Sequence, residues 1–226
     1  MRATRKIGRV TAAEAPPLYP SRSYAGATLG RLLYQRCEPP LVLLGVTPTG
    51  VEIAASAAKG TASAFDVIVG AHVRLGDHGI IGAIAEDAEA VIDRMFQPGF
   101  DQMDPLHDAI DRARRAVKSE RLLFRGQRQL RSLAGENVVV IDGQAVTPWK
   151  LLAAAHSARA AGAARIFVAA AVTTQAVKEK VFAYKYDFIC PAVVLDPVGH
   201  PRPFGDAQNA GAERLRSIVV ARQAAA

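Results

Sequence analysis

Two short segments carry the residues best suited to chemistry. Thr47, Thr49 and Gly50 stand in "GVTPTGV" after an apolar run, and Asp142 ends the apolar run "VVVI" just before "GQAVTPWK". Small residues between a strand and a helix let backbone N–H groups approach a phosphate, and the helix N-terminus favours its negative charge. The residue types therefore indicate a candidate site for a phosphate.

Strand and helix patterns alternate along the chain and must position these segments. Apolar runs predict strands over residues 41–44, 65–73, 138–141, 165–172 and 187–195. Helical spacing predicts helices over residues 24–35, 51–60 (with Gly60 as the stop), 148–161 and 174–184, and a long helix capped by Asp104. This alternation is typical of an α/β fold with a mostly parallel sheet and helices on both faces. Loops 45–50, 70–84 and 142–149 are then expected to line one cleft beyond the strand ends.

Composition places the chain in a broad class. Its 226 residues are 50% hydrophobic and 22% charged, which is enough for one sizeable core. We expect a flexible basic arm over residues 1–20 and a single domain over 21–226. Cys37 and Cys190 form no disulfide framework, no apolar run approaches membrane-spanning length, and the five histidines are scattered. These features favour a cytoplasmic protein without a bound structural metal.

A positive charge excess of +7 is concentrated in residues 112–131, "RARRAVKSERLLFRGQRQLR". A solvated helix face is the simpler interpretation of this segment. Nucleic-acid binding is an alternative, but few aromatic residues accompany the charges, and no helix-turn-helix or RNP-like pattern is present.

The ordered set of motifs resembles the type I phosphoribosyltransferase family. It comprises "YAGATLGRLL", "LVLLGVTPTGVEIAASAA", "FDVIV", "IIGAIAED", the basic helix, "NVVVIDGQAVT" and "ARIFVAAAV", from about Ser23 to about Asp206. The resemblance implies a parallel sheet with a small hood subdomain and a tendency to form homodimers. It also implies phosphoribosyl pyrophosphate as the ligand, with Mg²⁺ if the protein is active.

The segment after Asp142 departs from the family pattern. Asp142 matches the first of two family acids and is the catalytic candidate, but Gly143 replaces the second. Thr147 matches the first Thr of the phosphate turn, and Pro148 removes one N–H donor where a Gly belongs. Lys150 offers a charge, while Trp149 either packs in the core or fills the phosphate position. The substrate-binding candidates in this segment are Gly143, Gln144, Ala145, Val146, Thr147 and Lys150.

The other two loops depart as well. In the pyrophosphate loop, Pro48 replaces an Arg and Thr49 a Gly, so Thr47, Thr49 and Gly50 remain as candidates. In the flexible loop, Ala71 and His72 stand where the family has Arg-Lys, and Arg74 is the remaining candidate. The further group Arg74, Asp77 and His78 is either an acid/base cluster or, more simply, a polar turn.

Three functions remain open at the level of sequence. The first is a degenerate phosphoribosyltransferase-like protein that binds another phosphorylated sugar or nucleotide, or serves as a regulatory or scaffolding subunit. The second is an active phosphoribosyltransferase with an altered substrate, and the third is a basic nucleic-acid-binding regulator. Cys190 and His200 form a reactive pair only if the fold brings them together, and a buried structural cysteine is the simpler interpretation.

Overall fold

The centre of the computed structural model is a six-stranded parallel sheet. The structure describes residues 16–195, 202–206 and 211–223. The strand order is β2-β1-β6-β7-β8, and β9 pairs with a different part of β7. The strands are β1 (Leu41–Val46), β2 (Ala64–Ile68), β6 (Asn137–Ala145), β7 (Arg165–Thr174), β8 (Asp187–Ile189) and β9 (Ala192–Val194). All of their pairings are parallel, which confirms the predicted α/β class.

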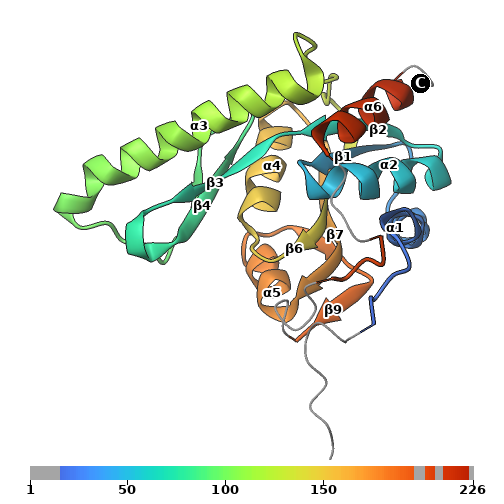
Figure 1. The fold of residues 1–226 in the computed structure, drawn as a ribbon, viewed down its shortest axis with the longest axis horizontal. Coiled ribbons are helices and arrows are strands. Elements are labelled where there is room, and N and C mark those ends of the chain that lie inside the picture. Colours follow the sequence, from blue (N-terminus) through green and yellow to red (C-terminus); the bar gives the residue numbers. More distant parts are fainter. Residues whose placement is uncertain (1–15, 196–201, 207–210, 224–226) are drawn as a thin grey trace, which may run out of the picture.

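Helices cover both faces of this sheet (Figure 1). Side chains of α1 (Arg22–Arg36), α2 (Thr49–Thr61) and α6 (Ala212–Gln223) join one buried cluster, and those of α4 (Trp149–Ala160) and α5 (Gln175–Ala183) join the other. Leu43 of β1 faces the first cluster, whereas Val42 and Leu44 face the second. Successive strand side chains point to opposite faces, so a strand buried on both sides reads as a continuous apolar run.

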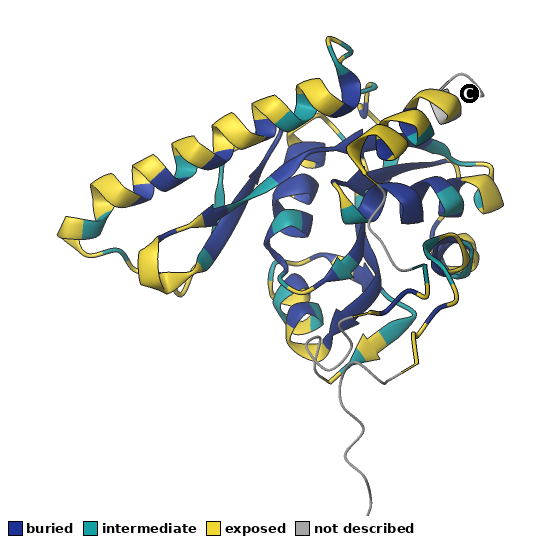
Figure 2. Ribbon diagram, viewed as in Figure 1, coloured by how far each residue is buried: buried dark blue, intermediate teal, exposed yellow. Residues whose placement is uncertain are grey.

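A second sheet forms an arm on this body. Strands β3 (Gly70–Arg74), β4 (Ile80–Ala85) and β5 (Val91–Ile92) are antiparallel, with the short helix η1 (Gly76–His78) at the hairpin tip. The helices η2 (Phe100–Gln102) and α3 (Met103–Arg125) follow, and α3 runs along the hairpin (Figure 1). Figure 2 shows that the outer face of α3 is exposed along its length, as expected for a solvated basic helix.

Several predicted boundaries were wrong. Gly60 lies inside α2, and Ala62 takes the left-handed C-cap with φ of 51°. The apolar run 65–73 splits into β2 and β3, which belong to different sheets, and the run 187–195 splits into β8 and β9. Asp104 is in the first turn of α3 rather than at its N-cap, which is Gln102. Local periodicity marks apolar segments but not the point where a chain changes sheets.

Residues 1–20 were expected to form a flexible N-terminal arm, but the described part of this segment lies against the domain that contains the parallel sheet. Tyr19 is buried, its hydroxyl donates to the Ala171 carbonyl at 3.1 Å, and its backbone bridges to Phe204. Arg22 pairs with Asp206 beside this bridge. The rest of the expected N-terminal arm, residues 1–15, lies outside the described residues, as do residues 196–201 and 207–210.

Candidate functional site

The candidate residues gather at the carboxyl ends of β1 and β6, where the first turns of α2 and α4 begin. Thr47 follows β1 and is fully buried, and Thr49 and Gly50 open α2. Asp142 lies within β6, and Lys150 lies in the first turn of α4. The parallel sheet thus brings together residues about a hundred positions apart in the chain, because the carboxyl ends of its strands meet at one edge.

Asp142 is engaged by its own protein. The carboxylate is buried, and Oδ1 accepts hydrogen bonds from the Thr49 hydroxyl and, at 2.7 Å, from the Gly143 backbone N–H. Hydrogen bonds to a charged acceptor are the stronger kind in proteins. The acid therefore holds the start of α2 against β6, and a sugar hydroxyl would have to displace Thr49 to reach the same oxygen.

Two glycines allow α2 and β6 to approach closely. A Cβ atom at Gly50 would lie 1.9 Å from the Ile141 carbonyl oxygen, and one at Gly143 would lie 2.5 Å from the Thr49 carbonyl oxygen. Real side chains do not tolerate such distances, so both positions require glycine for backbone packing. The missing side chains suggested room for a phosphate, but the neighbouring backbone occupies that space.

The expected loop from Gly143 to Trp149 is shorter than predicted. Strand β6 continues through Gly143, Gln144 and Ala145 and pairs with β7 as far as Ala145 and Thr173. The Thr173 hydroxyl also donates to the Ala145 carbonyl at 3.1 Å. Only residues 146–148 separate β6 from α4, with Val146 exposed and Thr147 half-buried. The extra strand residues were missed because Gly143 and Gln144 interrupt the apolar run.

Lys150 is the cation of this site. Its Nζ donates to the Thr47 carbonyl oxygen at 2.9 Å, which ties α4 to the end of β1. Glu120 on α3 lies beside this cluster. Burial raises the pKa of its carboxyl, and the nearby Thr47 and Lys150 oppose that rise. Glu120 was not among the sequence candidates, although it is the single acid within the basic segment 112–131.

His72 of β3 completes the cluster. Its Nε2 lies 3.1 Å from the Thr147 hydroxyl oxygen. Burial, assisted by the charges of Lys150 and Arg74, lowers the pKa of His72 from 6.5 to about 4. The imidazole is therefore neutral near pH 7, and it does not supply the positive charge that the Arg-Lys pattern would place here.

Other candidates lie away from this cluster. Arg74 is exposed further along β3. At the hairpin tip, His78 contacts the Gln102 amide at 2.9 Å and the edge of Phe96, so the segment 74–78 is a polar turn.

The indole of Trp149 is 5% exposed and packs edge-on against Tyr184 in the core beside α5.

Cys190 is not arranged as a nucleophile. Burial raises the pKa of its thiol to about 12, and its Sγ contacts the Ala192 carbonyl. The proposed partner, His200, lies outside the described residues. Cys190 is half-buried, and its raised pKa is typical of a structural rather than a reactive cysteine.

The site does not fit a Mg²⁺–pyrophosphate complex. Magnesium prefers carboxylate and phosphate oxygens in octahedral geometry. Here Asp142 lacks the adjacent second acid, and its Oδ1 is already bonded. Among the described residues there is also no group of three or more His, Cys, Asp or Glu side chains that could hold a metal.

Comparison with solved structures finds the same α/β fold in another protein. No family model matches the sequence. The structure is similar to TT1426 of Thermus thermophilus, with a TM-score of 0.76 and 22% identity over 90% of this chain and 98% of that one. Weaker similarity, with a TM-score of 0.47 and 12% identity, joins 76% of this chain to 80% of the adenine phosphoribosyltransferase of Thermoanaerobacter pseudethanolicus. The Mycobacterium tuberculosis orotate phosphoribosyltransferase matches 76% of this chain and 70% of its own at 14% identity and a TM-score of 0.43.

The chain thus shares the α/β fold of TT1426, with its central parallel sheet. Within the described part of the chain, no helix is both long enough and apolar enough to cross a membrane.

Proposed function

We propose that this protein is a phosphoribosyltransferase-like domain that has lost ordinary transferase activity and works as a ligand-binding, regulatory or scaffolding subunit. The observation that carries the proposal is the internal use of two of the three charged candidates, Asp142 and Lys150. The Asp142 carboxylate bonds Thr49 and Gly143, and the Lys150 ammonium bonds the Thr47 carbonyl. Groups already satisfied inside the fold gain little by binding a substrate.

The expected loss of affinity is large. Each charge-assisted contact to a phosphate contributes roughly 1.5–3 kcal/mol. The second acid, the Arg of the pyrophosphate loop and the Arg-Lys pair of the flexible loop are all replaced, by Gly143, Pro48 and residues 71–72. Losing three such contacts weakens binding by several powers of ten. Transition-state stabilisation declines in parallel, because this chemistry depends on fixed charges.

The direct test is calorimetric titration of the full chain with phosphoribosyl pyrophosphate in the presence of Mg²⁺. We expect millimolar binding or none. A micromolar dissociation constant would contradict the proposal, and pyrophosphate release in the presence of a nucleobase would contradict it further.

One observation favours an active enzyme as the second candidate. Two polar pairs remain near each other at the strand ends: Lys150 with Thr47, and His72 with Thr147, and the charge of Lys150 acts on His72. In that function Asp142 contacts the ribose, Thr147 and Lys150 hold the 5′-phosphate, and Thr47, Thr49 and Arg74 hold the pyrophosphate. The same titration separates the two candidates, because this one requires binding that Lys150→Gln weakens.

The remaining proposals concern assembly and location. We propose a homodimer, since large apolar side chains stand exposed at the arm tip, with Phe100 at 99% and Met95 at 82% exposure. Sedimentation at micromolar concentration tests it, and a monomer would refute it. We also propose a cytoplasmic location, because both cysteines are free.

A further inference from the structure

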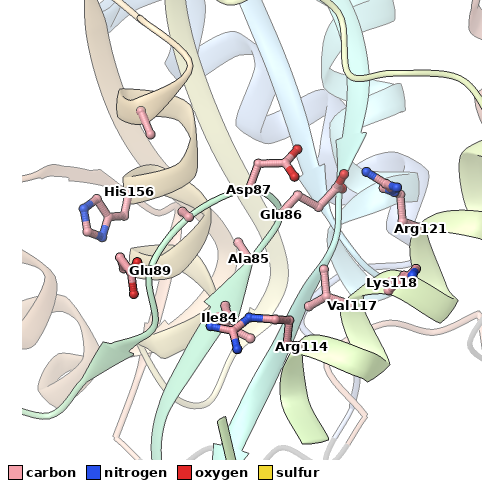
Figure 3. Close-up of a pocket in the computed structure, with 12 residues that line it drawn as sticks. Ile84, Ala85, Glu86, Asp87, Glu89, Arg114, Val117, Lys118, Arg121 and His156 are labelled. Carbon is pink, nitrogen blue, oxygen red and sulfur yellow. The ribbon is translucent and has the colours of Figure 1, made fainter. Parts of the chain in front are cut away.

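A cavity lies between α3 and α4, away from the strand ends that form the candidate site. Its volume is about 570 Å³, within the range of small-molecule sites. The wall contains the end of β4 and the turn that follows it, one face of α3, and the C-terminal half of α4 (Figure 3). Ile84, Ala85 and Val117 form its apolar part and are buried.

Cations line the α3 side of this cavity. Arg114, Lys118 and Arg121 are spaced by four and three residues, which places them on one helix face. Arg114 also bonds Asp111 at 2.6 Å on the surface. Neither Lys118 nor Arg121 is in an ion pair within the described residues, so both charges are available to an anion.

Two exposed acids, Asp87 and Glu89, come from the turn after β4. Figure 3 shows Glu89 beside His156 of α4, across the cavity from Arg121 and Lys118, and Asp87 between them with its carboxylate toward Glu86 and Arg121. Glu86 is different, because it is buried and paired with Arg125. Asp87 and Glu89 are exposed and are in no ion pair among the described residues.

We propose that this cavity binds a small phosphorylated compound that also carries hydroxyl groups, such as a sugar phosphate. The α3 cations bind the phosphate through charge-assisted hydrogen bonds. The carboxylates of Asp87 and Glu89 accept hydrogen bonds from the hydroxyl groups, which a bare phosphate cannot donate in the same way. The proposal is independent of whether the strand-end site retains activity.

Charge separation favours a small ligand over a nucleic acid. A polyanionic strand lying along the cavity would bring phosphates close to Asp87 and Glu89, where like charges repel. A compound with one phosphate at one end places its charge on α3 and its hydroxyls on the acids.

Calorimetric titration of the full chain with ribose 5-phosphate tests the proposal. The variant Lys118→Gln/Arg121→Gln is expected to bind at least about tenfold more weakly. The matched control is Arg112→Gln/Arg115→Gln, which removes the same charge from the same helix at exposed positions outside the cavity wall. The control is expected to change affinity less than about twofold at physiological salt.

A second pair of variants tests the acidic side. Asp87→Asn/Glu89→Gln is expected to weaken ribose 5-phosphate and to leave inorganic phosphate unchanged or tighter. Tighter binding of both compounds would overturn the role of the acids. Lys150→Gln should leave ribose 5-phosphate binding intact, and its loss would place the ligand at the strand ends instead.

Three further outcomes would overturn the cavity site. The first is that the protein binds no ribose 5-phosphate up to about 10 mM. The second is that the cavity variant and its control weaken ribose 5-phosphate binding equally. The third is that an oligonucleotide, whose own binding falls steeply with salt, competes with ribose 5-phosphate. The last result would assign the α3 cations to a nucleic acid.

Discussion

At the scale of single residues, Asp142 shows how a candidate catalytic acid can serve the fold. Its two hydrogen bonds join β6 to the first turn of α2 from a buried position. Catalytic carboxylates commonly reduce stability, because they are held for substrate rather than for the protein. The effect of removing Asp142 on stability therefore distinguishes a structural role from a catalytic one.

We predict that Asp142→Ala lowers the free energy of unfolding by about 2–3 kcal/mol, because the Thr49 hydroxyl and the Gly143 N–H lose their acceptor. Urea denaturation measures the change. Asp108→Ala, at an exposed position on α3, is the control and should change it by less than about 0.5 kcal/mol. An unchanged or more stable Asp142 variant would favour the active enzyme.

His72 gives a prediction about pH. Its pKa is about 4 in the folded protein, below the ordinary 6.5, so the unfolded chain takes up the proton first as the pH falls. Stability contributed by the neutral imidazole is then lost progressively from about pH 6.5 to about pH 4. Allowing for partial solvent screening, we expect a loss of about 1 kcal/mol between pH 7 and pH 5.

The comparison of His72→Gln with the unmodified chain isolates this contribution. The variant should lose less stability over that interval in urea denaturation, whereas His107→Gln, at an exposed position on α3, should follow the unmodified chain. Parallel curves for all three proteins would show that His72 titrates normally.

At the scale of elements, the contact of α2 with β6 decides what the candidate site can hold. Extension of β6 to Ala145 uses backbone that a phosphate loop would leave free, and Gly50 and Gly143 let the two backbones meet. The long partner strand β7 makes this extension possible, because it continues to Thr174 and offers pairing beyond Asp142.

We predict opposite effects of Gly→Ala at two positions of α2. At Gly50 the new methyl group would collide with the Ile141 carbonyl, and we expect a loss of at least about 3 kcal/mol. At Gly60, an exposed helical position with no atom within 4 Å, we expect a gain of about 0.5–1 kcal/mol. Thermal and urea denaturation report both, and a neutral Gly50→Ala would refute the close packing of α2 on β6.

At the scale of the whole molecule, one buried ion pair joins the arm to the body. Arg125, at the end of α3, contacts Glu86 after β4 and donates to the Val67 carbonyl of β2 at 3.0 Å. Glu86 in turn accepts from the Val69 backbone N–H, and its own carbonyl accepts from Ser157 of α4. The arm, the sheet and α4 therefore meet at one residue pair, next to the proposed sugar-phosphate cavity.

We predict that Arg125→Met lowers the free energy of unfolding by about 3–5 kcal/mol, because it leaves the buried Glu86 without its cation. The double variant Glu86→Gln/Arg125→Met should recover part of this loss. Arg115→Met, an exposed change on the same helix, should have little effect. Hydrogen exchange should show faster opening of β4 in the single variant, and unchanged exchange there would contradict a joining role.

Much of the architecture was determined by the sequence alone. Runs such as residues 41–44 and 165–172, alternating with helical spacing, indicated the parallel sheet and its helical layers, because burial periodicity is a local property of the chain. The long helix that begins near Asp104 was readable for the same reason.

Only the tertiary structure decided which partners the polar residues have. Nothing local reveals that Asp142 bonds Thr49, that Lys150 bonds a carbonyl after β1, or that Trp149 turns toward α5. The same holds for the cavity, which joins residues 84–89, one face of α3 and His156. Hydrogen bonds and ion pairs act over a few ångströms in space, whatever the separation in sequence, so their partners exist only once the chain has folded.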